Sequence, residues 1–360
     1  MRKSEPFFYL KMKTYTHLYE KLITKDNFEL AYINSIKGKA SQRQIQYFNK
    51  NKDRNLEKVR QLVIDGKFHT SRYRWQRIYE PKERIIYKLP YSPDRIVQHA
   101  IMNILKPIFT RLFIENSYAC IENRGQLKAT IKCNEYIRRN TYCLKCDIHK
   151  FYPSINQHIL SDMLHKIVRD SKFMAVVDDV IFSFEGGYNC PIGNYLSQWC
   201  GNFYLTKLDN YIKHELKCSD YERYCDDFLL FSNDKNYLND CRMKIEIFLR
   251  ENLELEYSKA DLFHVKQGVD FCGYRCFGKY VLVRKSTGKR IKKRIRHYWK
   301  KYSETDSLDE LKSMQGSVGS AIGWTLHACS NHFTDSIKLY KLKNEIDKKI
   351  FALTPPKTVK

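Results

Sequence analysis

The sequence lacks internal repeats, low-complexity segments and long apolar runs. No run approaches the roughly 18 apolar residues that a membrane-spanning helix needs. The first fifteen residues carry basic side chains but no continuous apolar stretch of the signal-peptide type. These absences argue against a repeat array and a membrane partner, and they predict a protein of the cytoplasm.

Cysteine pairs at metal-binding spacing are also scarce. The 12 cysteines are scattered through long hydrophobic segments, as reduced and buried thiols usually are. One CxxC is present, Cys143 to Cys146, in a strand-like stretch where residues three apart point to opposite faces. Because no second pair at zinc-finger spacing accompanies it, a structural zinc site is not expected.

Acidic residues are in deficit, with 40 Asp and Glu against 64 Lys and Arg and a formal net charge of +24. Such an excess indicates a polyanionic partner, because many basic contacts together release counterions from a phosphate backbone. No basic amphipathic helix with a clean apolar face is apparent, which argues against a membrane surface. The 26 Tyr and 20 Phe suit stacking on unpaired bases, so nucleic acid is the favoured partner.

Helical and strand-like patterns are mixed along the chain, which predicts an α+β fold. Alternation over 69–93, around a Pro-Lys-Glu turn, predicts a basic hairpin, and Asp94 is placed to cap the helix that follows. Residues 284–301 hold ten basic residues and no acid, which suggests a nucleic-acid clamp, with a solvated helix face as the alternative. The other predicted elements are helices over 15–65, 124–139, 157–182, 195–216 and 235–253, a strand over 141–155, and short strands over 268–277 and 279–284.

Two adjacent carboxylates stand out in YERYCDDFLLF, residues 221–231. Tyr221–Tyr224 and Phe228–Phe231 are predicted as the strands of a β-hairpin, with Asp226 and Asp227 between them. On this stretch alone, a pair of acids that caps a solvated turn is the more common explanation.

A third carboxylate, Asp147, lies on a predicted strand, on the same face as Cys143 and Lys145. If that strand lies beside the hairpin, Asp147 meets Asp226 at one edge of an antiparallel sheet. Crowded carboxylates resist ionisation unless cations neutralise them. Magnesium prefers such oxygen ligands, and two ions about 4 Å apart can activate a hydroxyl and stabilise leaving pyrophosphate. The pattern predicts nucleotidyl transfer, with Asp227 in a weaker, supporting place.

Several segments, in order along the chain, resemble the motifs of the reverse transcriptases, which are right-hand polymerases with palm, fingers and thumb. YCDD at Tyr224–Asp227 is similar to their metal-binding hairpin, and DIHKFYPSI from Asp147 to their first acidic motif. The further matches are YKLPYSPDRIVQHAI (87–101), SYACIENRGQLKA (117–129), PIGNYLSQWCGNFYLTKLD (191–209), a lysine at 259, and GVDFCGYR (268–275).

The resemblance implies a role for each matching residue. Two magnesium ions, for which manganese can substitute, would be held by Asp147, Asp226, Asp227 and the backbone carbonyl of Ile148. Lys259 is similar to the family's late lysine, a general acid toward pyrophosphate. The residues expected to contact the incoming nucleotide are Tyr152, which would exclude a 2′ hydroxyl, and Arg84, Lys88, Arg95, Gln198 and Ile192. Those expected to contact template or primer are Gly193, Ser197, Tyr224, Arg124, Arg284, Lys285, Lys292, Lys293 and Arg296. A core tyrosine is the alternative for Tyr152, and a plain surface charge for the cations.

One motif departs from the commonest family pattern. Most bacterial and retroviral enzymes carry QG followed by SP, whereas this chain reads IGNYLSQ at 192–198, with Gln198 in the proline's place. That form is similar to the reverse transcriptases of diversity-generating retroelements, which copy an RNA with frequent errors opposite adenine. Antiphage defence enzymes are the alternative. Group II intron enzymes fit less well, because little sequence follows the predicted thumb.

The resemblance therefore predicts an α+β right-hand polymerase with an N-terminal helical segment (1–80), fingers (81–140), a palm (141–283, with fingers-associated helices at about 157–190) and a basic helical thumb (284–360). It would synthesise DNA on an RNA template from dNTPs and a DNA or RNA primer. The resemblance adds a small basic accessory protein or a non-coding RNA as partners, and a bacterial or phage source. The rival from another class is a non-catalytic RNA-binding scaffold.

Overall fold

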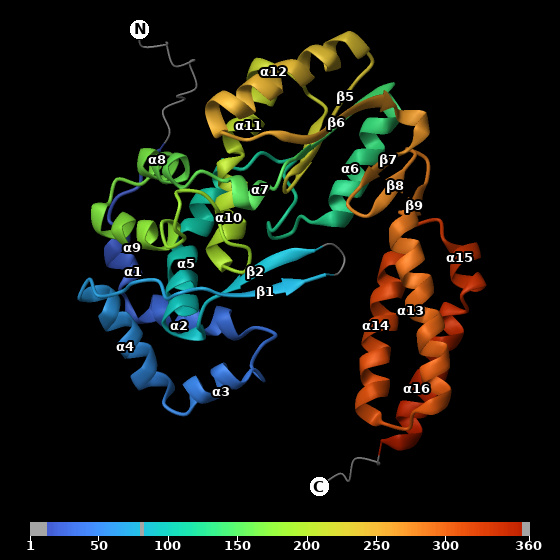
Figure 1. The fold of residues 1–360 in the computed structure, drawn as a ribbon, viewed down its shortest axis with the longest axis horizontal. Coiled ribbons are helices and arrows are strands. Elements are labelled where there is room, and N and C mark those ends of the chain that lie inside the picture. Colours follow the sequence, from blue (N-terminus) through green and yellow to red (C-terminus); the bar gives the residue numbers. More distant parts are fainter. Residues whose placement is uncertain (1–12, 80–82, 355–360) are drawn as a thin grey trace. The chain divides into compact units, whose positions relative to one another are not determined.

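The computed structural model describes residues 13–79 and 83–354 and contains both helices and antiparallel strands (Figure 1). The α+β prediction is confirmed. The chain divides into two compact units, each assembled from separate segments. The first unit takes the described parts of 1–121, 146–219 and 241–260, and the second takes 122–145, 220–240 and 261–360.

The first unit is mainly helical, and its centre is the long helix α5 (Ile96–Leu112), which carries ten buried residues. Helices α2 and α10 pack against α5. The remaining helices and turns of this unit are α1 (Leu18–Leu22), α2 (Lys25–Ile36), α3 (Arg43–Asn49), α4 (Lys52–Ile64), η1 (Tyr91–Arg95), α7 (Phe151–Ser154), α8 (Gln157–Ile167), α9 (Ser171–Ile181), α10 (Tyr195–Tyr204), α11 (Thr206–Asn210) and η2 (Tyr211–Glu215).

The predicted basic hairpin is confirmed as β1 (Arg74–Ile78) paired antiparallel with β2 (Arg84–Lys88). Part of the predicted Pro-Lys-Glu turn falls on residues 80–82, outside the described residues. The end of β2 is tied to a distant loop, since the Tyr87 amide donates to the Ile192 carbonyl at 2.8 Å. The hairpin is thereby held against the loop before α10.

Three local predictions in this unit are wrong. The strand expected over 141–155 ends at Ile148, and Phe151–Ser154 form α7 instead. Asp94 does not cap α5, because its carboxylate accepts instead from the Ser71 amide and hydroxyl, both at 2.8 Å. The helix expected over 157–182 is two helices, α8 and α9, because Asp170 between them accepts from the Phe173 amide at 3.0 Å and starts a new helix there. The partner of Asp94 is distant in sequence and no local pattern reveals it, whereas Asp170 is a local N-cap that the prediction of a single helix overlooked.

The second unit is built on antiparallel strands and helix α6 (Gln126–Arg139), which contacts β4, β7 and β8. One sheet has the strand order β4-β5-β3-β6 and another β7-β8-β9. Their strands are β3 (Tyr142–Ile148), β4 (Tyr221–Tyr224), β5 (Asp227–Ser232), β6 (Tyr257–His264), β7 (Val269–Phe271), β8 (Tyr274–Cys276) and β9 (Val281–Val283), joined in part by α12 (Lys235–Leu253) and η3 (Val265–Gln267). The division between the units crosses β3, α12 and β6.

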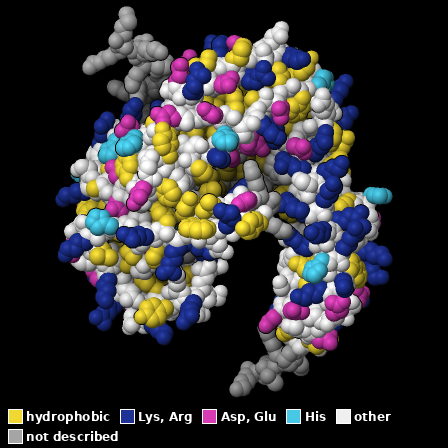
Figure 2. All heavy atoms as spheres, viewed as in Figure 1, with side chains coloured by type: hydrophobic (Ala, Val, Ile, Leu, Met, Phe, Trp, Pro, Cys, Tyr) yellow, Lys and Arg dark blue, Asp and Glu magenta, His cyan; other side chains and the backbone are white. Residues whose placement is uncertain are grey.

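Four C-terminal helices complete the second unit: α13 (Lys285–Glu304), α14 (Leu308–Leu326), α15 (Asn331–Ser336) and α16 (Leu339–Leu353). Helices α13, α14 and α16 lie side by side (Figure 1) around a shared apolar core that includes Ile295, Val318 and Leu342. Lys and Arg side chains gather over the exposed side of α13 (Figure 2). The basic helix predicted from 284–301 is thus confirmed. No helix among the described residues has the length and apolar character that a membrane crossing requires.

Candidate active site

The paired carboxylates lie where the hairpin of the second unit turns. Tyr224 pairs with Asp227, so only Cys225 and Asp226 form the turn and Asp227 is the first residue of β5. The predicted hairpin is confirmed, with its second strand one residue longer at the start. Cys225 has a left-handed φ of 56°, and the buried Arg223 donates from Nη1 to its carbonyl at 3.0 Å. Arg223 thereby stabilises a turn that a non-glycine residue adopts at a cost.

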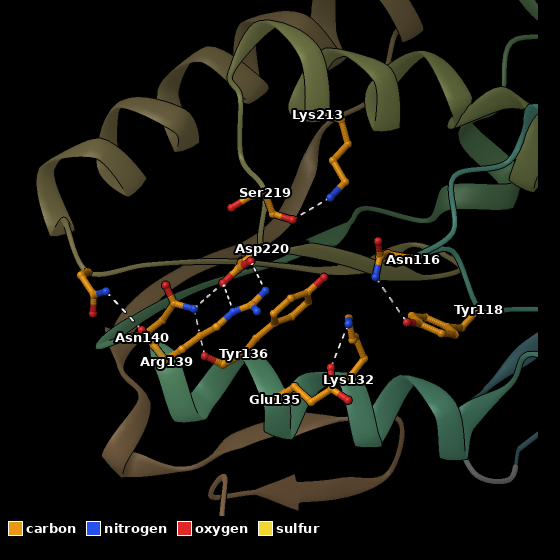
Figure 3. A network of polar contacts seen from close by, with 11 residues as sticks. Asn116, Tyr118, Lys132, Glu135, Tyr136, Arg139, Asn140, Lys213, Ser219 and Asp220 are labelled. Atoms are coloured by element: carbon orange, nitrogen blue, oxygen red, sulfur yellow. Dashed lines mark hydrogen bonds and ion pairs between the residues drawn. The ribbon is translucent and has the colours of Figure 1, made fainter.

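The base of this hairpin is anchored to α6. Asp220, just before β4, accepts from Arg139 at 2.8 and 2.5 Å and from the Asn140 amide at 2.6 Å (Figure 3). The fork of Arg139 suits a carboxylate, and paired bonds of this kind fix its orientation. Backbone pairing and this anchor together determine where Asp226 and Asp227 are held relative to the second unit.

Asp147 lies on β3, in the part of that strand that belongs to the first unit. The Ser258 hydroxyl donates to its carboxylate and, at 3.2 Å, to its backbone carbonyl. Ile148, the next residue, is buried. The structure therefore assigns Asp147 to one unit and Asp226 and Asp227 to the other, and their meeting around metal ions stays a prediction.

The donor chemistry fits magnesium. Asp147, Asp226 and Asp227 are all partly exposed, although Oδ1 of Asp227 is buried, and carboxylate oxygens are the hard ligands that magnesium prefers. Over residues 13–79 and 83–354, no cluster of three or more His, Cys, Asp or Glu side chains is positioned to hold a metal by itself. Magnesium usually takes one or two protein carboxylates and completes its shell with water and substrate phosphates.

Gly193 in the loop before α10 makes a close approach that only glycine permits. Its φ is +123°, and a Cβ at this position would lie 2.1 Å from the carbonyl oxygen of Tyr87. The N-terminus of α10 is held from the other side by Gln98, whose Oε1 accepts from the Tyr195 amide at 3.0 Å. The loop predicted to lie beneath the template is therefore clamped between β2 and α5.

Replacing Gly193 by alanine is expected to lower the free energy of unfolding by about 2–4 kcal/mol, because backbone strain and steric overlap add. Gly186→Ala is the matched control: Gly186 has a φ of +100° but nothing within 4 Å of its added Cβ. Gly186→Ala should therefore lower the free energy of unfolding through backbone strain alone, without steric overlap. Thermal unfolding of both variants measures the difference, and equal losses would show that the approach to Tyr87 has no importance.

Other residues expected at the nucleotide or the template lie in this loop or near it. Tyr152 packs on α10, where a Cβ on Gly201 would come within 3.0 Å of its ring. Ser197 is buried, Ile192 is half-buried and Gln198 is exposed. Of this group, Gln198 therefore has the side chain most open to a nucleotide.

Arg95, before α5, is a half-buried guanidinium for which no carboxylate partner exists in the described part of the chain. Burial lowers its pKa, and the nearby Lys39 ammonium also has a lowered pKa because of burial and the Arg95 charge. His99, stacked on Tyr195 at 4.1 Å, has a pKa lowered to about 3 by burial and these cations, so it is neutral at pH 7. Cations that form no ion pair with a carboxylate favour binding of an external anion.

The remaining predicted contacts are distributed over both units. Arg84 and Lys88 are exposed on β2, and Lys259 is exposed on β6, in the first unit. Arg124 is half-buried just before α6 in the second unit. The cations expected to contact nucleic acid at the start of the C-terminal helices are also in the second unit, with Lys285, Lys293 and Arg296 exposed and Arg284 and Lys292 half-buried.

A family model described as "Reverse transcriptase (RNA-dependent DNA polymerase)" matches residues 80–276, more than half of the chain. The chain belongs to the reverse transcriptase family. Members of this family are RNA-directed DNA polymerases, that is, nucleotidyltransferases, and the mixed helix-and-sheet structure agrees with their polymerase fold.

Three curated proteins are similar in sequence to this member of the reverse transcriptase family. "Putative COX1/OXI3 intron 2 protein" of Saccharomyces cerevisiae is 24% identical, with 50% of this chain and 29% of the relative covered. "Nuclear intron maturase 4, mitochondrial" of Arabidopsis thaliana is 26% identical, with 43% and 21% covered. "Protein YkfC" of Escherichia coli is 23% identical, with 62% and 71% covered. The chain thus spans less than a third of the length of the first two.

Sequence reasoning missed the residues that support those it found. Arg223, Gln98 and Ser258 each bond a backbone or carboxylate atom of a predicted motif from outside it. No local pattern marks Ser258 or Gln98. One sequence feature could have pointed to Arg223. It is a charged residue within a short predicted strand, and if such a strand is buried, the charge requires a partner.

Proposed function

We propose that this protein is an active reverse transcriptase that copies an RNA template into DNA by nucleotidyl transfer. The observation that carries the proposal is the Cys225–Asp226 turn, which presents Asp226 and Asp227 from a rigid hairpin in a chain of this family. A non-catalytic RNA-binding scaffold would have no need for carboxylates at a surface that receives phosphates.

Each of the predicted site residues has a separate role in this proposal. Asp147 and Asp226 would hold magnesium, which when bound supplies charge neutralisation and an activated primer hydroxyl. Tyr152 would contact the sugar of the incoming dNTP, and Lys259 would donate a proton to pyrophosphate. Arg95, Arg84 and Lys88 would bind phosphates of the nucleotide or of the template.

The remaining proposed contacts concern the nucleic acid. The loop with Gly193 and the start of α10 with Ser197 would support the template, and the basic side chains of α13 would bind the duplex as a thumb. The proposal thus assigns residues 81–140 to the fingers, 141–283 to the palm and 284–360 to the thumb of the polymerase. A purified protein that extends a DNA primer on an RNA template with magnesium, and not after chelation, is the expected result; RNA binding without extension under any divalent cation would favour the scaffold.

The biological role that we propose is error-prone synthesis in a diversity-generating retroelement. Its support is the IGNYLSQ sequence, together with the exposure of Gln198 beside a loop clamped by Tyr87 and Gln98. Antiphage defence is the second candidate. The intron proteins among the relatives are similar to 50% and 43% of this chain. A structured RNA or small basic protein partner remains part of the proposal.

Sequencing of the DNA made in cells distinguishes these roles. Substitutions concentrated at template adenines are expected for diversification. Faithful copies, or a repetitive product made only during phage infection, would instead support defence.

Tyr152→Ala is expected to raise the ratio of ribonucleotide to deoxyribonucleotide incorporation by at least about tenfold, because removal of the ring opens space for a 2′ hydroxyl. The ratio is measured by primer extension with each nucleotide type. Tyr47→Ala, at a tyrosine of α3 that is 75% exposed, serves as the control. An unchanged ratio in Tyr152→Ala would remove the sugar-selecting role.

A further inference from the structure

An open cavity of about 280 Å³ lies among the C-terminal helices of the second unit. It is bordered by α13, by the end of α15 and by the start of α16 (Figure 1), and is called the α13–α16 cavity below. The residues that line it are three cations, an indole, a hydroxyl and an aliphatic side chain: Arg296, Lys338, Lys341, Trp299, Ser336 and Ile337. Its volume is that of about nine molecules of liquid water, which leaves room for one small group.

The charge that borders this cavity is entirely positive. None of the lining residues is acidic, and within the described part of the chain Arg296, Lys338 and Lys341 form no ion pair. Cations around one hollow repel one another, and an anion that enters relieves the repulsion. All three are exposed, so the attraction for that anion should weaken as salt is added.

The sequence at the start of α16 favours an external anion as well. Lys338 is the residue before the helix, and Lys341 lies in the first turn, which contains no acid. Cations are unfavourable at this end, because the first amides of a helix carry partial positive charge. Lys338 makes no side-chain cap, whereas Ser, Thr, Asp or Asn would supply one. An anion bound in the cavity would offset charge that the helix itself disfavours.

The indole of Trp299 gives the cavity an apolar wall. Its Nε1 donates to the carbonyl of Ile337 at 3.4 Å, so the polar edge of the ring already has a partner. The side chain is half-buried, and nucleic-acid bases stack on aromatic rings with little dependence on base identity. Pockets for apolar small molecules are usually larger and lined mainly by hydrophobic side chains. Cations for a phosphate beside an indole for a base favour a nucleotide instead.

We propose that the α13–α16 cavity binds one unpaired nucleotide of a single-stranded RNA segment. The cations hold its phosphate, and Trp299 stacks on its base. A duplex is a poor ligand for this cavity, because its bases stack on one another and unpaired bases alone can be splayed onto an aromatic ring. A role of this site in copying RNA rests on the proposed function, whereas RNA binding by the cavity can be measured without it.

The test measures binding of two fluorescein-labelled RNAs to the full chain by fluorescence anisotropy: single-stranded hexauridine and a short blunt-ended duplex. Trp299→Leu is expected to raise the dissociation constant for the single strand about tenfold, because the stacking of one base is lost. The constant for the duplex should change less than about twofold. A double variant, Lys338→Gln with Lys341→Gln, should weaken single-strand binding at least about fivefold and lower the slope of its salt dependence by about one.

Tyr340→Leu and Lys312→Gln are the matched controls, because both residues are exposed on C-terminal helices and neither lines the cavity. Both should keep the two dissociation constants within about twofold of the wild type. Trp299→Phe retains a ring and should retain most of the single-strand affinity. Trp299 also packs against the apolar core of these helices, so thermal unfolding is measured for each variant. Should Trp299→Leu not fold, the double lysine variant decides.

Three results would overturn the proposal. Equal losses of affinity for single strand and duplex would leave a general basic surface. Unchanged single-strand affinity in the folded variants would leave three solvated cations beside a core tryptophan. Free uridine monophosphate that displaces hexauridine at an equal concentration would assign the cavity to a free nucleotide rather than to a strand.

Primer extension by the wild-type protein is a separate measurement, so the two proposals can fail independently. Single-strand binding that depends on Trp299, in a protein that extends no primer, supports the cavity and contradicts the proposed function. Primer extension by a protein whose RNA binding is insensitive to Trp299 and to the two lysines contradicts the cavity alone.

Discussion

Replacing Asp226 by alanine is expected to lower primer extension at least about a thousandfold, at the upper end of what loss of one group that stabilises transition-state charge usually costs. Asp226 lies in a turn fixed by the pairing of Tyr224 with Asp227 and by the Arg223 guanidinium. The Asp226 side chain is partly exposed and does not belong to the buried core. Its removal should therefore leave the melting temperature and the affinity for RNA largely unchanged. Single-nucleotide incorporation, thermal unfolding and RNA binding measure the three quantities.

Asp309→Ala provides the control, because Asp309 is an exposed carboxylate in the first turn of α14. It should keep full activity. Asp147→Ala should resemble Asp226→Ala, since both are proposed cation ligands, although they lie in different units. Substantial synthesis by purified Asp226→Ala protein would refute the metal assignment.

Much of the fold follows from local sequence patterns. Alternation and turn chemistry were sufficient to predict the β1–β2 and β4–β5 hairpins, and Gly125 marked the start of α6. The failures have different physical causes. Asp94 has the chemistry of a helix cap, but its partner Ser71 is far away in sequence. Asp170 caps α9 locally through the Phe173 amide, and it also accepts from the distant Leu18 and Tyr19 amides. Periodicity within a short window carries no information about such partners.

In the candidate site, too, residues with nearby partners in sequence were predicted and residues with distant partners were not. Asp226 and Asp227 were found because a hairpin keeps its chemistry within a few residues. Lys145 had a visible signal in its alternation with Asp147, but its ion pair with Asp227 spans 82 residues of sequence. The meeting of Asp147 with Asp226 depends on the arrangement of two units, which no local pattern determines, so it stays a prediction.

The largest effect expected on stability comes from Glu222, whose carboxyl is fully buried in β4, the first strand of the hairpin that carries Asp226 and Asp227. It pairs across the strands with Leu229. Burial is the main cause that raises its pKa well above the usual 4.5, and the Cys276 thiol adds to the shift. The folded protein therefore holds a proton on Glu222 at pH values where the unfolded chain has released it.

The sign of the pH dependence follows from this difference. Because the folded state binds more protons than the unfolded state above pH 4.5, stability from this group is fully present below that pH and falls as the pH rises toward the folded pKa. The slope is at most about 1.4 kcal/mol per pH unit. Glu222→Gln has no proton to lose, so its free energy of unfolding relative to the wild type should increase steadily from pH 5.5 to pH 8.5.

Urea unfolding of both proteins at several pH values measures that relative slope, in which the titration of all other groups cancels. The buried amide of glutamine brings donors that need partners, which costs about 1–3 kcal/mol but shifts the comparison equally at every pH. Glu251→Gln, at an exposed glutamate of α12, should show no slope. If the difference between Glu222→Gln and the wild type were constant with pH, Glu222 would have to be ionised inside the fold, and the account of a neutral carboxyl in the β4–β5 hairpin would be wrong.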